Sequence, residues 1–191
     1  MNYVFHGSKT SNLMEIEPRI STHQESLVYA AKSPCIATVF LSNGGNDLVY
    51  VLGGQGTKEK PAYLVERLPG SLSKIFNNNG SIYTLDDNSF VPREGLWDAE
   101  VVAKGIQKVL REEKIDDVLV TLEEYVTEGI LKLYRYPDRP NFIPIDNSDL
   151  IDKYIRFYQM GNLGDIKRLL SLYPEFEDEV NSRLEKKLTL K

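Results

Sequence analysis

Residues 27–41 read LVYAAKSPCIATVFL and join two kinds of secondary structure. The run 27–30 is apolar or aromatic and favours a β-strand. Ser33-Pro34 then favours a helix start, because a serine side chain accepts backbone N–H groups at the N-cap and proline fits the first turn. Asn43 and the two glycines after it end the helix. The stretch therefore predicts a strand followed at once by a capped helix of about two turns.

A second β-favouring run precedes this stretch. Residues 3–6 read YVFH, and Gly7-Ser8 ends the run, so His6 lies at the end of a predicted strand. Residues 9–25 mix charged and polar side chains without a sustained period. They predict a long irregular connection between the two strands, of a kind that often carries function.

The remainder of the chain mixes strands and helices. β-favouring runs occur at 47–52, 62–68, 81–85, 97–102 and 130–136, and a helical stripe occurs at 117–129. After the Pro-rich stretch 137–144, helical spacing dominates at 149–159, 164–172 and 175–188. The pattern predicts an α+β body over residues 1–146 and a small helical C-terminal segment over residues 147–191.

Composition excludes several classes of function. The chain has 191 residues, of which 41% are hydrophobic and 27% charged, as expected for one soluble globular body. Its net charge of −5 disfavours general binding to duplex nucleic acid. The single cysteine, Cys35, forms no internal disulfide and predicts a cytoplasmic protein. No run is long and apolar enough to predict membrane insertion, and two histidines make a multi-histidine metal site improbable.

Common catalytic patterns are absent from the sequence, including the nucleophile elbow and the kinase motifs. Adjacent carboxylates such as Glu112-Glu113 are predicted to solvate a surface, because neighbouring residues of a helix do not face each other. Cys35 lies next to Ile36 in the predicted helix and is interpreted as a small buried hydrophobe.

His6-Gly7-Ser8 at one strand end and Tyr29-Ala30 in the next strand form a more informative combination. Their order resembles that of the ADP-ribosyltransferase superfamily, in the diphtheria-toxin-like branch that includes poly(ADP-ribose) polymerases, rifampicin-modifying transferases and RNA 2′-phosphotransferases. In that family a histidine strand end, a tyrosine strand and a later glutamate strand line one NAD cleft. Phe40 stands where polymerase-like members carry a second aromatic residue, and Glu100 is the best candidate for the glutamate, with Glu94 as the alternative.

The resemblance covers roughly residues 1–136 and implies a split, mainly antiparallel sheet that holds NAD as substrate. It implies that His6 hydrogen-bonds the adenosine-side ribose and that Gly7 and Ser8 meet the nicotinamide carboxamide. Tyr29, with Ala30 beside it, would hold the nicotinamide ring. Glu100 would be the catalytic residue, because a carboxylate stabilises the positive charge that develops on the ribose as nicotinamide leaves.

Each of these residues has a plainer interpretation. His6 could be a strand-end histidine bonded to the backbone, and Glu100 could be an outward-facing strand residue. Tyr29 and Phe40 could be core aromatics, which for Phe40 is the favoured interpretation. Lys32 and Arg67 could meet the NAD pyrophosphate, although surface solvation is favoured for both.

The predicted function is therefore transfer of ADP-ribose from NAD to an unidentified macromolecular or small-molecule acceptor, with release of nicotinamide. One alternative is a catalytically inactive nucleotide-binding or protein-interaction module of the same fold. Another is RNA 2′-phosphotransferase-like activity, which the acidic composition disfavours because an RNA substrate requires a basic groove.

Overall fold

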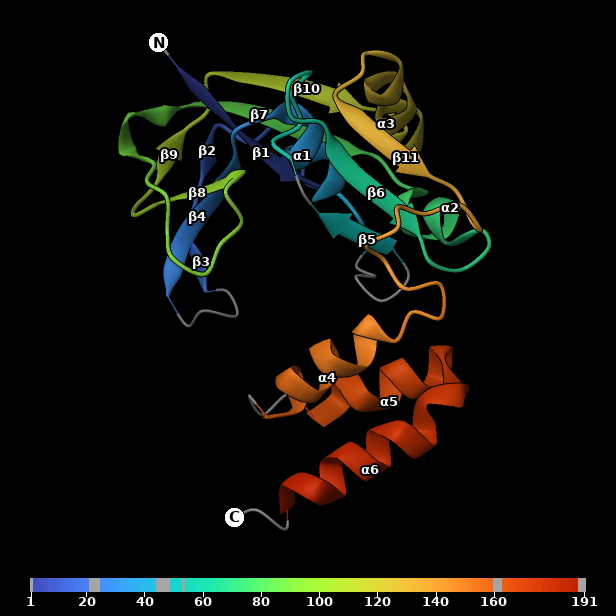
Figure 1. The fold of residues 1–191 in the computed structure, drawn as a ribbon. Coiled ribbons are helices and arrows are strands. Elements are labelled where there is room, and N and C mark those ends of the chain that lie inside the picture. Colours follow the sequence, from blue (N-terminus) through green and yellow to red (C-terminus); the bar gives the residue numbers. More distant parts are fainter. Residues whose placement is uncertain (1, 21–24, 44–48, 53, 160–162, 189–191) are drawn as a thin grey trace. The chain divides into compact units, whose positions relative to one another are not determined.

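The chain forms two compact units, Met1–Asp138 and Arg139–Lys191 (Figure 1). The structure is a computed structural model that describes residues 2–20, 25–43, 49–52, 54–159 and 163–188. The fold is α+β, with mostly antiparallel strands in the first unit and helices in the second. None of the described helices combines the length and the apolar character that a membrane span requires.

The main sheet of the first unit is antiparallel throughout. Its strands follow the order β10, β7, β1, β4, β3, and β8 pairs with β4 as well. The bounds are β10 (Arg111–Ile115), β7 (Gly80–Asp86), β1 (Tyr3–Ser8), β4 (Ser26–Ala31), β3 (Arg19–Ile20) and β8 (Glu100–Ala103). Strands far apart in sequence are therefore neighbours, and Figure 1 shows β8 beside β4.

Strand β1 pairs along its whole length with β7 but at only one position with β4. Six residue pairs join β1 to β7, from Tyr3 to Ser8. A single pair, Phe5 opposite Ala31, joins β1 to β4. Since the ladder to β4 does not continue past Phe5, the sheet opens between His6 and Tyr29. This opening positions the candidate site.

Smaller sheets complete the first unit. The second sheet contains β5 (Val49–Leu52), β6 (Ala62–Glu66) and β11 (Leu131–Tyr134), with β6 antiparallel to β5 and parallel to β11. Helix α3 (Val118–Thr127) contacts β11, and the remaining elements are α2 (Ser71–Phe76) and the 3₁₀ turn η1 (Asp87–Ser89). A two-stranded ribbon joins β2 (Glu15–Ile16) to β9 (Gln107–Lys108).

Helix α1 (Pro34–Val39) begins as the sequence predicts. Ser33 is its N-cap, and the Ser33 hydroxyl accepts a hydrogen bond from the Cys35 N–H at 3.2 Å. The same hydroxyl donates to the Gly56 carbonyl at 2.9 Å, which ties the β5–β6 connection to the helix start. Cys35 is fully buried as predicted, and burial raises the pKa of its thiol to about 12.

The second unit is a small cluster of helices. It contains α4 (Asp149–Gln159), α5 (Leu163–Leu172), the 3₁₀ turn η2 (Pro174–Phe176) and α6 (Glu177–Leu188). Tyr173 and Phe176 stack with ring centroids 5.2 Å apart, and Arg183 pairs with Asp152 and Glu179. The Arg139 guanidinium donates to the Asn147 side chain at 2.9 Å, so part of the Pro-rich stretch is tied to the helices.

Several elements differ from the sequence predictions. Residues 9–25 contain the two-residue strands β2 and β3, and 111–115 forms the edge strand β10 although its side chains are mostly charged. The predicted strand at 97–102 begins only at Glu100, because residues 97–100 form a turn closed by the Glu100 N–H and the Trp97 carbonyl at 2.8 Å. Residues 47 and 48 of another predicted strand lie outside the described residues.

Gly7 allows α1 to approach β1 closely, which yields a stability prediction. A Cβ atom at this position would lie 2.3 Å from the Ala37 carbonyl oxygen. We therefore expect Gly7→Ala to lower the free energy of unfolding by about 1–3 kcal/mol, the usual cost of overpacking. Urea denaturation measures the change. Ser8→Ala, on the same strand, is the matched control and should cost about 1 kcal/mol or less, since it removes only the hydrogen bond that the Ser8 hydroxyl accepts from the Thr10 N–H; equal stability of both variants would contradict the expectation.

Candidate functional site

A small cavity opens where β1 and β4 separate, and we call it the ring cavity. Its volume is about 160 Å³. The residues that line it come from β1, β4, the end of α1 and the start of β8, namely Phe5, His6, Gly7, Tyr29, Ala30, Phe40 and Glu100. Six of the residues named from the sequence, His6, Gly7, Tyr29, Ala30, Phe40 and Glu100, therefore lie around one cavity, although they span almost a hundred positions of the chain.

Sheet register explains how Glu100 reaches this cavity. Phe5 lies opposite Ala31 on β4, and Ala31 lies opposite Glu100 on β8. Directly opposite residues of antiparallel strands point to the same face of a sheet. Phe5 and Glu100 consequently lie on one face, two strand spacings or about 10 Å apart.

His6 spans the opening between the two strands. Its Nδ1 atom lies 2.7 Å from the Tyr29 carbonyl oxygen, which can only accept a hydrogen bond. Nδ1 must therefore carry the proton, and in the neutral ring Nε2 is a hydrogen-bond acceptor. Burial lowers the pKa of His6 below its ordinary value of 6.5, and the nearby positive charge of Arg19 lowers it further, whereas the bond to Tyr29 opposes this shift. The imidazole is thus neutral at neutral pH.

An adjoining cavity of about 420 Å³ shares His6 and Tyr29 with the ring cavity. Ser8 lies here and not in the ring cavity, and its hydroxyl accepts a hydrogen bond from the Thr10 N–H at 3.1 Å. The other polar lining residues are Glu15, Glu17 and Arg19. His6 and Tyr29 thus form the boundary between a small cavity with aromatic walls and a larger cavity with charged walls.

Glu100 already has a structural role within its turn. Its Oε2 atom accepts a hydrogen bond from the Trp97 N–H at 3.3 Å. This bond orients the side chain at the start of β8. Glu94, the alternative glutamate, is exposed in the preceding turn and does not line the ring cavity.

The aromatic side chains of the ring cavity are partly exposed. Phe40 is 46% exposed, so the interpretation of Phe40 as a core residue is wrong. It is the C-cap residue of α1, where the helix ends at the cavity. Tyr29 is half-buried. Phe5 also lines the cavity, and the sequence signal for it is its place in a β-favouring run directly before His6.

Gly7 has a packing role, and Arg67 is buried away from both cavities. The absence of a side chain at Gly7 is required by the Ala37 carbonyl of α1, so its packing alone accounts for the glycine. Arg67 is 1% exposed, and the expectation that it is solvated is wrong. It follows directly after β6 and lines neither cavity. Lys32 is exposed, as expected.

Glu112 anchors the loop that follows β1. Its Oε1 atom accepts hydrogen bonds from the Ser81 hydroxyl at 2.6 Å and from the Asn12 N–H at 3.0 Å, and the Tyr83 hydroxyl lies 3.1 Å away. The Tyr83 hydroxyl in turn accepts the Leu13 N–H at 3.2 Å, and Leu13 lines the adjoining cavity. The expectation that Glu112 only solvates a surface is therefore wrong. The sequence carried no signal for this role, because the bonds join residues 29 to 100 positions apart.

Comparisons of the chain with protein-family models, curated proteins and solved structures find no match. Within the part of the chain that the structure describes, no group of three His, Cys, Asp or Glu side chains is placed to hold a metal ion.

The pKa of His6 yields a prediction on pH. The folded chain should keep His6 neutral below pH 6.5, where the unfolded chain begins to bind a proton. Because the folded chain has the lower pKa for His6, it binds this proton less readily than the unfolded chain does. The free energy of unfolding is therefore highest above pH 6.5 and decreases as the pH falls from 6.5 toward the lowered pKa. NMR titration of the His6 ring should give a pKa below 6.5. Its signals are assigned by their loss in His6→Asn; a titration at or above the ordinary value would refute the prediction.

Glu112 yields a second prediction on pH. Hydrogen bonds from Ser81 and from the Asn12 N–H lower its pKa below the ordinary value of 4.5. Stability from these bonds is present above pH 4.5 and is lost as the pH falls through the lowered pKa. Unfolding free energies measured across this range should depend less on pH in Glu112→Gln than in the wild type. Glu113→Gln is the control, because Glu113 pairs only loosely with Arg111 at 3.7 Å and should retain the wild-type pH dependence.

Proposed function

We propose that this chain breaks the bond between nicotinamide and ribose in NAD and transfers the ADP-ribosyl group to an acceptor. The observation that carries the proposal is the ring cavity, which combines aromatic walls, a carboxylate from Glu100 and a neutral histidine at its boundary with a larger cavity. The resemblance of His6-Gly7-Ser8 and Tyr29-Ala30 to ADP-ribosyltransferase motifs supports the same function.

The size of the ring cavity suits the leaving group. A protein cavity of about 150 Å³ accommodates a benzene molecule, so about 160 Å³ suits one six-membered aromatic ring and not a whole dinucleotide. Phe5, Tyr29 and Phe40 supply aromatic contact surface for such a ring. Nicotinamide is the ring of NAD that is released in this reaction, and we assign it to this cavity.

The larger part of NAD would occupy the adjoining cavity. That cavity shares His6 and Tyr29 with the ring cavity, and its volume lies within the range of small-molecule sites, about 300–1,000 Å³. The neutral His6 ring offers Nε2 as an acceptor for a ribose hydroxyl. Arg19 provides a guanidinium for the pyrophosphate, whereas Glu15 and Glu17 make the same walls unfavourable for a longer polyanion such as RNA.

Glu100 would act on the reacting carbon. When the bond between ribose C1′ and the nicotinamide nitrogen breaks, the electron pair leaves with nicotinamide and the ribose becomes oxocarbenium-like. A carboxylate beside the ribose stabilises this positive charge, as in glycoside hydrolysis. The acceptor oxygen or nitrogen then bonds to C1′ and loses its proton to solvent. Glu100 thus has the role of stabilising the ribosyl cation and positioning the acceptor.

The hydrogen bond from the Trp97 N–H to Glu100 also favours a second candidate function. A carboxylate held by its own turn is compatible with a chain that binds NAD without turning it over. This alternative predicts binding of NAD with no release of nicotinamide.

Replacement of Glu100 tests the proposal. In Glu100→Gln the amide oxygen can still accept the Trp97 N–H, so the turn and the fold should persist while the negative charge is lost. We expect nicotinamide release from labelled NAD to fall by a factor on the order of 100 or more, as when a transition-state charge partner is removed. Glu94→Gln, in the exposed turn nearby, is the matched control and should retain wild-type release.

Three results would count against the proposal. Full activity of Glu100→Gln would remove Glu100 from the mechanism. Calorimetry that shows NAD binding to the wild type without nicotinamide release would support the non-catalytic alternative. Absence of NAD binding would refute both candidate functions.

A further inference from the structure

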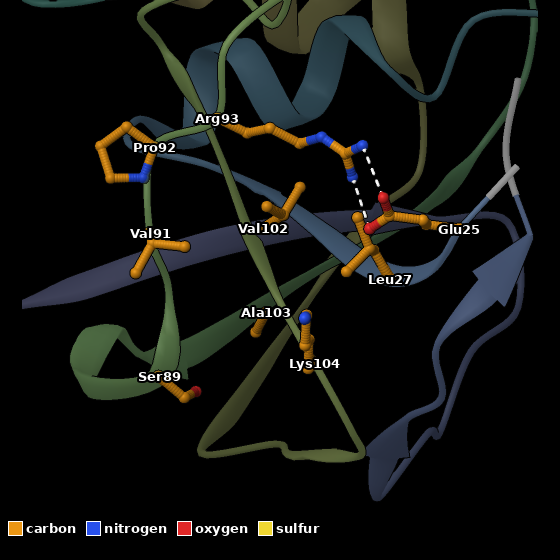
Figure 2. Close-up of a pocket in the computed structure, with 9 residues that line it drawn as sticks. All are labelled: Glu25, Leu27, Ser89, Val91, Pro92, Arg93, Val102, Ala103 and Lys104. Carbon is orange, nitrogen blue, oxygen red and sulfur yellow. Dashed lines mark hydrogen bonds and ion pairs between the residues drawn. The ribbon is translucent and has the colours of Figure 1, made fainter. Parts of the chain in front are cut away.

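A third cavity, of about 510 Å³, lies along β8, and we call it the β8 cavity. Figure 2 shows the residues that line it. They come from the start of β4, the segment 89–93 and the second half of β8. The cavity is larger than either of the two cavities assigned to NAD, and neither nicotinamide nor the rest of NAD occupies it in the proposed reaction.

Sheet register places the β8 cavity beside the ring cavity. Val91 exchanges backbone hydrogen bonds with Val102 at 2.9 and 3.0 Å, and Val102 lies opposite Tyr29 on β4. These three residues therefore form one row across the sheet and point to the same face. Val91 and Val102 line the β8 cavity, whereas Tyr29 lines the ring cavity. One strand spacing, about 4.8 Å, separates the two walls.

Glu100 lies on the same face as this row. It precedes Val102 by two positions on β8, so both side chains point to one face about 7 Å apart along the strand. A molecule in the β8 cavity could therefore reach the carbon at which Glu100 would act. A transfer reaction needs such a place, because its second substrate must approach the reacting carbon while the donor remains bound.

Two lining residues of the β8 cavity form an ion pair. The Arg93 guanidinium donates to both carboxylate oxygens of Glu25, at 3.0 and 3.1 Å, and Figure 2 shows the Arg93 side chain extending from its own segment to Glu25. The Glu25 side chain is 55% exposed. The pair joins the segment before β8 to the residue before β4, and an exposed pair of this kind contributes little to stability.

The lining indicates the chemistry of the occupant. Its apolar part consists of Leu27, Val91, Pro92, Val102 and Ala103. Its charged part has two cations, Arg93 and Lys104, and one carboxylate, Glu25. The apolar walls favour an apolar body, the excess positive charge favours an anionic group, and the volume suits a small molecule.

We propose that the β8 cavity binds the second substrate of the transfer, a small molecule with an apolar body and an anionic group. This proposal rests on the proposed function. After the C1′–nitrogen bond breaks, a hydroxyl or amine of the bound molecule forms the new bond to ribose C1′. Nicotinamide leaves with the bonding electron pair, and the proton of the nucleophile passes to solvent.

A fluorescent probe of this class tests the binding site. Anilinonaphthalene sulfonate has an aromatic body and one negative charge, and its fluorescence rises in apolar surroundings. Titration of the folded wild-type chain should show one site that persists in the presence of saturating ADP-ribose. Val91→Asp places a like charge at the cavity and should weaken binding on the order of tenfold or more. Val120→Asp is the matched control, because Val120 is similarly exposed on α3, outside the cavity, and should leave binding unchanged.

A second variant tests whether the positive charge of Lys104 contributes to binding. Lys104→Gln should weaken binding of the sulfonate probe but not binding of the neutral analogue phenylnaphthylamine. Circular dichroism establishes that each variant is folded. Equal binding by Val91→Asp and the wild type, equal losses in Val91→Asp and Val120→Asp, an equal effect of Lys104→Gln on both probes, or displacement of the probe by ADP-ribose would each overturn the site.

Nicotinamide release tests the role as second-substrate site. The bound probe should shield the reacting carbon from water and lower release by the wild type severalfold, and this response should be lost in Val91→Asp. Unchanged release at saturating probe would overturn this role while leaving the proposed function intact. Absence of release in every condition would overturn the proposed function and the second-substrate role together, and the fluorescence titration alone would then decide whether the cavity is a ligand site.

Discussion

The separation of β1 from β4 is the constraint on which the rest of the candidate site depends. One residue pair, Phe5 with Ala31, joins the two strands before the opening, and the hydrogen bond from His6 to the Tyr29 carbonyl spans the opening itself. If the ladder continued in this register, the backbone of Gly7 would pair with that of Tyr29, and no opening would separate the two strands. The single bond therefore sets both the position of the imidazole and the boundary between the ring cavity and the adjoining cavity.

Two features hold this opening in shape. On one side, α1 packs against β1 so closely that position 7 has no room for a side chain, and the helix ends with Phe40 at the cavity. On the other side, Glu112 gathers hydrogen bonds from the loop after β1 and from β7. A buried helix and a polar cluster thus support the walls of the opening from two directions.

Prediction from sequence succeeded where local chemistry decides the structure. The Ser33-Pro34 start of α1 and the apolar strands around His6 and Tyr29 follow from capping and from β-propensity within a few residues. Prediction from sequence failed where contacts with residues distant along the chain determine the structure. Residues 111–115 lack an apolar pattern and form a strand only because β7 offers an edge to pair with, and Arg67 is buried although its type favours solvent. Phe40 is exposed because it ends a helix at a cavity, which no local pattern reveals.

Local sequence chemistry accounts for the α+β mixture, the capped helix after the second long strand, and the set of residue types that a site for NAD would need. Long-range strand pairing, in contrast, places residues as distant as Phe5 and Glu100 on one face, separates Ser8 from Gly7 into different cavities, and aligns Val91, Val102 and Tyr29 in one row. Register explains the difference. Local propensity makes a segment a strand, but the pairing between strands determines which side chains meet, and that pairing depends on partners up to a hundred residues away.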